Sequence, residues 1–121
     1  FSIKAPNQPI LIPLNKVLFE WVIENLVKNS VDAMKGKGTI LITISNEINH
    51  VIVNISDTGD GIENAMKKNI FKPGVTSKKR GWGLGLSLSK RIIEEYHKGS
   101  IFVEHSEKGI GTTFSIKLTK N

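Results

Sequence analysis

Two short segments of alternating apolar residues constrain the fold of this chain more than any other feature. Isoleucine or valine occupies every second position of both segments: Ile40, Ile42, Ile44, Val51, Val53 and Ile55. Side chains two residues apart lie on the same face of a β-strand. The polar stretch Asn46–Asn49 between the segments is typical of a hairpin turn. The sequence therefore predicts a pair of strands with one apolar face, which another layer has to cover.

Two longer segments have apolar residues at the spacing of amphipathic helices. The first begins after Pro13, is capped by Asn15 and ends near Met34. The second begins near Leu84 and ends near Gly99. The residues that recur on one face are Leu18, Val22, Leu26, Asn29 and Ala33 in the first segment, and Leu84, Leu88, Ile92 and Tyr96 in the second. Each predicted helix thus has an apolar face that can cover the sheet.

Shorter elements complete the predicted fold. Local apolar runs and turn residues indicate edge strands at Phe1–Ile3 and Ile10–Ile12, a short helix at Glu63–Asn69, a basic loop at Phe71–Trp82, and closing strands at Ser100–Ser106 and Thr112–Thr119. Strand pairs joined by hairpins, with helices between them, are typical of an α/β two-layer sandwich. We expect one mixed sheet, covered on one face by about three helices.

The composition is that of one soluble globular domain. The chain has 121 residues, of which 39% are apolar and 23% charged, so it can bury one hydrophobic core but not two. It has no cysteine, which excludes disulfides and thiolate metal sites. No apolar run is long enough to cross a bilayer. Because the chain begins with Phe1 rather than Met, we expect residues 1–121 to be a single domain of a longer protein.

The net charge of +6 favours an anionic partner. Four cations cluster before the glycine-rich segment Gly81–Leu86: Lys72, Lys78, Lys79 and Arg80. No basic stripe alternates with aromatic residues, so we do not expect nucleic-acid binding. The three histidines do not have metal-ligand spacing on any one element, so we do not expect a zinc site.

Asn25 and Asn29 are four residues apart, so they lie on one face of the first predicted helix, beside its apolar residues. A buried amide costs about 1–3 kcal/mol unless it is hydrogen-bonded. Two interpretations remain open from the residues alone. Both side chains cap neighbouring backbone, or both line a polar cleft and offer an amide oxygen to a hard cation such as Mg²⁺.

Asp57 continues the alternation of the second strand and therefore faces its apolar side. A carboxylate there needs a donor, which the amino group of an adenine can supply; the alternative is an aspartate turn that closes the strand. The glycines that follow permit a close backbone approach. Gly81–Leu86 opens the second helix, where backbone amides can hold phosphates. Each of these signals is ambiguous by itself.

Taken in order, five segments resemble the motifs of the catalytic, ATP-binding domain of sensor histidine kinases. This family belongs to the superfamily that includes gyrase, Hsp90 and MutL ATPases. The similar segments are Glu24–Ala33 for the N box, Asp57–Ile62 for the first glycine box, Ile70–Lys78 for the F box, Gly81–Leu86 for the second glycine box, and Gly109–Phe114 for the closing glycine-threonine motif. The resemblance covers nearly the whole chain.

The resemblance implies a Bergerat fold that holds Mg-ATP between the first long helix and a lid. The positions that match nucleotide-binding residues are Asn25, Asn29, Asp57, Gly59, Gly61, Ile62, Phe71, Lys72, Gly83, Leu84, Gly85, Leu86 and Thr112. By this resemblance Asn29 binds Mg²⁺, Asp57 accepts from the adenine amino group, and Thr112 places a hydroxyl near the adenine. Asn25 and Lys78 would support phosphoryl transfer, which depends mainly on positioning and electrostatics. Gly74 and Trp82 depart from the family's pattern in the lid.

One position separates the branches of this superfamily. Gyrase-, Hsp90- and MutL-like ATPases place a water-activating glutamate four residues before the metal-binding asparagine, and here that position is Asn25. Glu24 lies about 100° further round the helix. The resemblance therefore favours phosphoryl transfer to a histidine over hydrolysis. None of the three histidines has the Glu and Pro of the family's acceptor box after it, so the acceptor has to lie outside this segment.

The partners implied by the resemblance are a histidine-containing dimerisation domain of the same parent protein and a response regulator. We expect a cytoplasmic domain that is monomeric by itself and a homodimeric parent, with anchoring of the parent in the inner membrane left open. Three alternatives stay open at this point: an ATPase of the MutL or Hsp90 kind that uses Glu24, a serine kinase of the anti-sigma-factor kind, and a module that binds ATP without catalysis.

Overall fold

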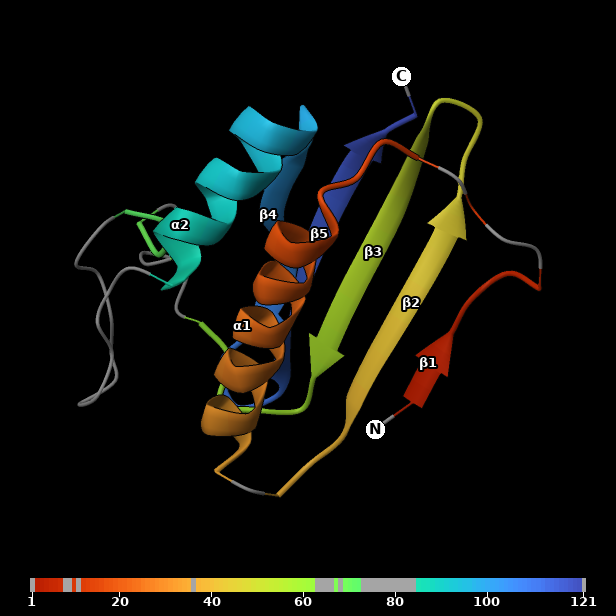
Figure 1. The fold of residues 1–121 in the computed structure, drawn as a ribbon. Helices are drawn as coiled ribbons and strands as arrows, with labels where there is room; N and C mark the ends of the chain where they lie inside the picture. The colour runs from red at the N-terminus through yellow and green to blue at the C-terminus, as the bar shows by residue number, and fades with distance from the viewer. Residues whose placement is uncertain are drawn as a thin grey trace.

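A mixed five-stranded sheet forms one layer of the fold, and two helical segments form the other (Figure 1). The computed structural model describes residues 2–7, 10, 12–35, 37–62, 67, 69–72 and 85–120. The strands are β1 (Ser2–Lys4), β2 (Ile40–Asn46), β3 (His50–Asp57), β4 (Ser100–Glu107) and β5 (Gly111–Thr119). The helices are α1 (Lys16–Met34) and α2 (Gly85–Arg91), and α2 continues as a π-helical turn, η2 (Ile92–Tyr96). None of the described helices is both long and apolar enough to span a bilayer.

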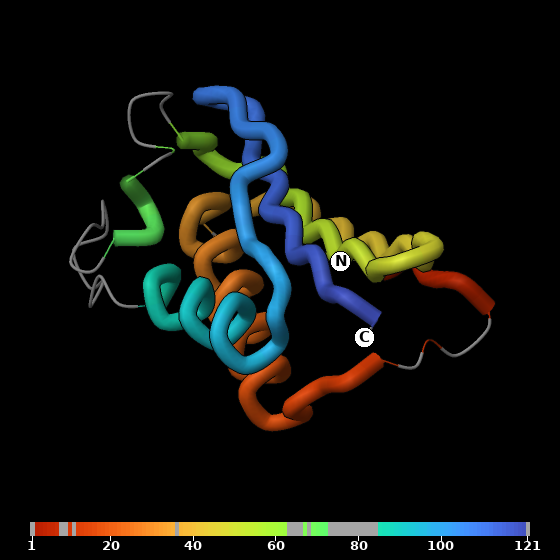
Figure 2. Tube along the Cα trace, turned by 90° about the horizontal axis from the view of Figure 1, so that it is seen from above, coloured from red at the N-terminus to blue at the C-terminus, as the bar shows by residue number. Residues whose placement is uncertain are grey.

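The sheet has the strand order β1-β2-β3-β5-β4. β2 and β3 form the predicted antiparallel hairpin, in which Ile42 lies opposite Ile55. β5 pairs antiparallel with both β3 and β4, whereas β1 pairs parallel with β2 and so makes the sheet mixed. Both helical segments lie side by side on the same face of the sheet (Figures 1 and 2). The predicted fold class, an α/β two-layer sandwich with a mixed sheet, is confirmed.

The hydrophobic core lies between this face of the sheet and the two helices. Every second side chain of β3, from Val51 to Asp57, is buried, as the alternation predicts. The largest contributions from the helices are Val22 and Leu26 of α1 and Ile93 of η2, all fully buried. The Ser30 hydroxyl is also buried on α1, without a hydrogen-bond partner among the described residues. Leaving such a group unpaired costs about 1–3 kcal/mol.

The element boundaries agree with the sequence-based predictions except near the N-terminus and in η2. Ile10 and Ile12 do not belong to a strand, because the flanking prolines Pro9 and Pro13 lack the N–H that a ladder needs. The third helix was predicted at Glu63–Asn69; most of this segment lies outside the described residues, and Lys67 and Asn69 have turn conformation. The second long helix changes to π-helical geometry at Ile92, which its apolar spacing did not reveal.

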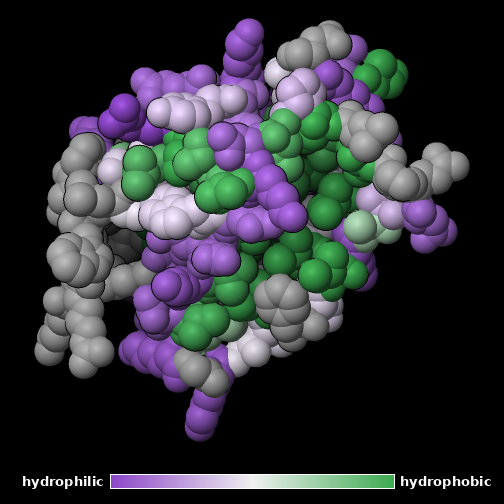
Figure 3. Space-filling view, in the orientation of Figure 1, coloured by the Kyte–Doolittle hydropathy of each residue, from purple (hydrophilic) through white to green (hydrophobic). Residues whose placement is uncertain are grey.

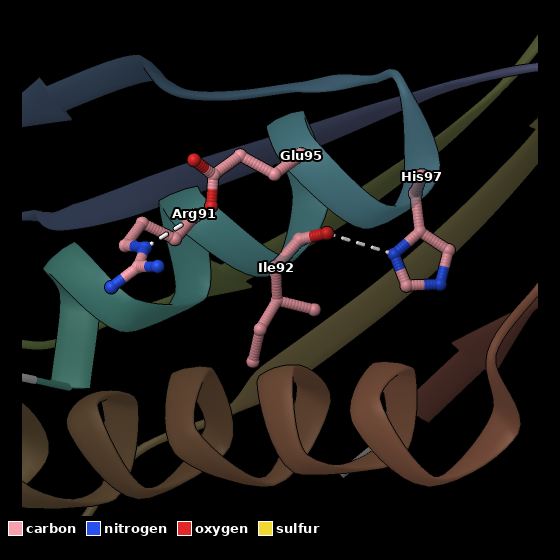
Figure 4. A network of polar contacts seen from close by, with 4 residues as sticks. All are labelled: Arg91, Ile92, Glu95 and His97. Atoms are coloured by element: carbon pink, nitrogen blue, oxygen red, sulfur yellow. Dashed lines mark hydrogen bonds and ion pairs between the residues drawn. The ribbon is translucent and has the colours of Figure 1, made fainter.

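His97 connects the end of η2 to the beginning of α1. It is buried, and its Nε2 accepts a hydrogen bond of 3.0 Å from the backbone N–H of Asn15, the N-cap residue of α1. Because Nε2 accepts, the ring is neutral and Nδ1 carries the hydrogen, which it donates over 2.9 Å to the carbonyl oxygen of Ile92 (Figure 4). The ring also lies edge-on to Phe19, with centroids 6.0 Å apart.

We expect His97→Phe to destabilise the domain by about 1–3 kcal/mol, because the aromatic ring is kept while a buried carbonyl and a backbone N–H lose their partner. Urea unfolding followed by circular dichroism measures this difference. His105→Phe is the matched control, since His105 is exposed on β4, and it should change the free energy of unfolding by no more than about 0.5 kcal/mol. Equal stability of the two variants would contradict this role of His97.

Candidate functional site

Asp57 is the last residue of β3 and is 8% exposed. Its Oδ1 accepts two backbone hydrogen bonds, from Gly59 at 2.9 Å and from Thr112 of β5 at 3.3 Å. The bond from Gly59 closes an aspartate turn, which is the alternative that the residues alone left open for Asp57. Among the described residues no hydrogen bond reaches Oδ2. The carboxylate therefore closes the strand with one oxygen and keeps an acceptor for a ligand with the other.

The turn after Asp57 is held between α1 and the β4–β5 connection. A Cβ on Gly59 would lie 2.8 Å from the backbone carbon of Ala33, and the N–H of Asp60 donates to the Ala33 carbonyl oxygen over 3.1 Å. On the other side, Gly61 has a φ of +78°, and a Cβ there would lie 2.2 Å from the carbonyl oxygen of Glu107. The glycines after Asp57 were predicted to permit a close backbone approach. On both sides of the turn, the group that lies close to them is protein backbone.

Thr112 and Ser106 form a buried hydroxyl pair behind this turn. Their oxygens are 2.8 Å apart, and Ser106 Oγ accepts from the backbone N–H of Ile62 over 2.7 Å and donates to the Gly111 carbonyl oxygen over 3.3 Å. Either hydroxyl can be the donor in this pair, and in both cases the Thr112 oxygen keeps a lone pair for a further contact.

Ser106 was not predicted as a site residue from the sequence, and a β-bulge explains why. The register of β4 with β5 shifts between Val103 and His105. In an unbroken alternation with Ile101 and Val103, Ser106 would face away from the core, but the extra residue reverses the side on which later residues lie. No signal in the sequence marks the position of this bulge.

Asn25 of α1 contacts the beginning of α2. Its Nδ2 donates to Ser89 Oγ over 3.1 Å, and Ser89 Oγ donates to the Gly85 carbonyl oxygen over 2.8 Å. The interpretation that Asn25 caps neighbouring backbone is therefore wrong, because its partner is a side chain of another helix. A Cβ on Gly85 would lie 2.6 Å from Asn25 Oδ1, so a glycine is needed at this contact. Asn29 is half-buried one turn further along the same face of α1.

The remaining predicted site residues fall into two groups. Phe71 is half-buried edge-on to Phe114, with centroids 6.2 Å apart, and the Lys90 ammonium lies 6.0 Å from the centre of its ring. Leu86 packs against the hydrophobic core, and Lys72 is exposed. The predictions for Lys78, Gly83 and Leu84, with the departures at Gly74 and Trp82, lie outside the described residues.

These contacts form two groups along α1. Asn25 joins the middle of α1 to the start of α2, and the turn after Asp57 joins the end of β3 and the start of β5 to the last turns of α1. An adenine fits the acceptor of Asp57. A magnesium ion fits amide oxygens on α1, because Mg²⁺ takes few protein ligands and completes its shell with phosphates and water. Within the described part of the chain, no cluster of three His, Cys, Asp or Glu residues offers a different metal site.

A second hollow lies away from these residues, between the first half of α1 and the outer side of α2 and η2. It has a volume of about 340 Å³ and is lined mainly by apolar side chains, among them Val17, Trp21 and Leu88. Figure 3 shows apolar residues on this helical side of the molecule, interrupted by hydrophilic ones. Because the hollow has no carboxylate or amide in its lining, it does not fit a nucleotide.

Comparisons with known proteins give one consistent result. The family described as "Histidine kinase-, DNA gyrase B-, and HSP90-like ATPase" matches residues 15–121. Sporulation kinase E of Bacillus subtilis (strain 168) is 43% identical over 98 residues, which are 80% of this chain and 13% of that protein. The signal transduction histidine-protein kinase AtoS of Escherichia coli (strain K12) is 40% identical over 122 residues, covering 100% of this chain and 20% of AtoS. The chain thus spans about a fifth or less of these curated relatives.

Solved structures agree with the sequence comparison. A structure of the catalytic domain of histidine kinase ThkA is 31% identical, with a TM-score of 0.87, and the match covers 98% of this chain and 77% of that one. A structure of ThkA in complex with the response regulator protein TrrA matches with 29% identity and a TM-score of 0.83 over 99% of this chain and 34% of that one.

We expect Gly61→Ala to destabilise the domain far more than Gly109→Ala, although both glycines have a positive φ. At Gly109 a Cβ would meet nothing within 4 Å, so the substitution costs only the left-handed backbone, about 1–2 kcal/mol. At Gly61 the Cβ would also collide with the Glu107 carbonyl, which adds about 1–3 kcal/mol. Urea unfolding of both variants measures the difference, and equal losses would show that the turn does not depend on this contact.

Proposed function

The chain belongs to the histidine kinase-, DNA gyrase B- and HSP90-like ATPase family, and from this premise we propose that it is the ATP-binding catalytic domain of a two-component sensor histidine kinase. It donates the γ-phosphoryl group of ATP to a histidine on a dimerisation domain of the same parent protein. The likeness to the catalytic domain of ThkA and to named sensor kinases supports this assignment.

The observation that carries the proposal is the Asn25 amide. It occupies the position at which the hydrolysing members of the superfamily have a glutamate, and Ser89 and Gly85 hold it there. An amide does not ionise at neutral pH and cannot take a proton from a water molecule. Glu24 is exposed on another side of α1. A site with this side chain is suited to a substrate that brings its own nucleophile, such as an imidazole nitrogen.

The proposed roles rest on the family resemblance, and the contacts of Asp57 and Asn25 support them. Asp57 accepts from the adenine amino group with Oδ2, and Thr112 offers a hydroxyl oxygen behind it. Gly59, Gly61 and Ile62 border the base. Asn29 holds the magnesium ion, and Asn25 lies near the phosphates. The lid begins at Phe71 and Lys72, and its Lys78 offsets charge as the γ-phosphoryl group leaves. The residues of the second glycine box that meet the phosphates are Gly83, Leu84, Gly85 and Leu86.

In the proposed reaction the histidine nitrogen attacks the γ-phosphorus. An N–P bond forms, the bond from phosphorus to the bridging oxygen breaks, and ADP leaves with that electron pair. Asn29 would hold a magnesium ion, which would supply charge screening for the phosphates. A response regulator would then take the phosphoryl group from the histidine, a role supported by the complex of ThkA with TrrA. We infer a homodimeric parent, because the acceptor is a dimerisation domain.

We expect Asp57→Asn to weaken ATP binding about 10- to 100-fold, because the amide keeps an oxygen for Gly59 and Thr112 but replaces the charged acceptor with a donor. Isothermal titration calorimetry measures the dissociation constant. Asp60→Asn is the matched control: it removes an exposed carboxylate from the same turn, where it pairs with Lys35, and should leave the affinity unchanged. Equal affinities of wild type and Asp57→Asn would refute the adenine role.

Mixing the domain with Mg-ATP and a separately produced histidine-containing dimerisation domain of its parent should place phosphate on that domain. The phosphoramidate is acid-labile and base-stable, which distinguishes it from phosphoserine. Its amount should be unaffected by Glu24→Ala, because the histidine needs no added base. The proposal fails if ATP binds and no phosphate is transferred, or if steady-state release of inorganic phosphate dominates and depends on Glu24.

A further inference from the structure

Ser89 lies between the two helices and is fully buried, although it is polar. Its hydroxyl group has one hydrogen, which it donates to the Gly85 carbonyl oxygen within α2 at 2.8 Å. The same oxygen accepts the 3.1 Å hydrogen bond from Asn25 Nδ2 of α1. Ser89 therefore joins the helix with the asparagines to the helix that follows the second glycine box.

This arrangement determines which end of the Asn25 amide faces the site. Because the Ser89 hydrogen is already used, the atom of Asn25 that faces Ser89 has to be a donor, which is Nδ2. The flat side of the amide packs against the backbone of Gly85, where a Cβ would lie 2.6 Å from Oδ1 and 3.0 Å from Nδ2. Among the described residues no hydrogen bond reaches Oδ1. Asn25 is thus held with one hydrogen of its NH₂ group on Ser89 and its oxygen beside Gly85 of the second glycine box.

An amide oxygen that lies beside a triphosphate favours the metal-bound form of the nucleotide over the metal-free form. It repels the anionic oxygens of a bare triphosphate, and it attracts a magnesium ion or the hydrogens of a metal-bound water. An amide that turned over would present its NH₂ group and donate to a bare phosphate oxygen instead. The orientation of Asn25 is therefore a means of distinguishing ATP with its metal from ATP without it.

We propose that Ser89 is a positioning residue that fixes the Asn25 amide with its oxygen toward the nucleotide, so that the site prefers Mg-ATP over metal-free ATP. This inference rests on the proposed function, because it assumes that the triphosphate lies beside Asn25. Ser89 acts through Asn25 and does not itself touch the nucleotide. Gly85 assists by leaving room for the amide.

The test compares the dissociation constants for ATP in excess Mg²⁺ and in EDTA, measured by isothermal titration calorimetry on the 121-residue chain. We compare the dissociation constant for metal-free ATP, divided by that for Mg-ATP, between variants. Ser89→Ala should lower this ratio about three- to tenfold, because the Asn25 amide can then turn over and donate to metal-free ATP. Ser89→Thr keeps the hydroxyl and should restore the ratio. Ser115→Ala is the matched control, because Ser115 is also buried and hydrogen-bonded, to Asn54 and Glu104, but lies on the opposite face of the sheet.

A second readout needs no nucleotide. In wild type the side-chain NH₂ hydrogens of Asn25, assigned by their absence in Asn25→Asp, should exchange slowly with water in ¹⁵N NMR spectra, and Ser89→Ala should make them exchange fast. The inference is overturned if Ser89→Ala weakens both forms of ATP by the same factor, or if the exchange is unchanged. If wild type binds neither form of ATP while its amide is protected, the proposed function fails and the positioning of Asn25 stands.

Discussion

The burial of the Asp57 carboxylate is the constraint on which the end of β3 and the turn after it depend. A charged group on the apolar face of a sheet is costly unless donors meet it. The donors come from two places, the turn that follows β3 and the first residues of β5, and both reach the same oxygen. Asp57 thereby holds the turn against β5, and its other oxygen remains an acceptor. The same side chain thus stabilises the end of the sheet and offers an acceptor to a ligand.

The glycines around Asp57 lack a Cβ, so neighbouring backbone segments can pack close to the turn and to the start of β5. Gly59 lies against the last turns of α1, and Gly61 against the end of β4. A Cβ on Gly111 would lie 2.0 Å from the carbonyl oxygen of Asp57 itself. The first glycine box is therefore packed by its protein neighbours on each side. Protein contacts fix its position relative to α1, which reduces the ordering that binding of a ligand would have to impose.

Polar contacts hold the helix pair at both ends of an apolar interface. His97 joins the end of η2 to the N-cap of α1, and Ser89 joins the start of α2 to Asn25. Since Gly85 lies within the second glycine box, its contact with Asn25 holds the end of that box against α1. Phe71, beneath the Lys90 ammonium, ties the F box to the same helix. Residues from each of the five motifs are thus in contact with α1, α2 or another motif.

Local periodicity predicted the two long helical segments, the five strands, the fold class and the side of the sheet on which Asp57 lies, because helical and strand periodicity are local properties of the chain. The N-cap at Asn15 followed from local chemistry in the same way. Only the tertiary structure decided that Asn25 faces Ser89, that Ser106 lies behind Thr112, and that His97 joins two helices. These pairs are 64, 6 and 82 residues apart. They depend on helix packing, on a bulge and on a π-helical turn, which change the direction of a side chain without leaving a mark in the local pattern.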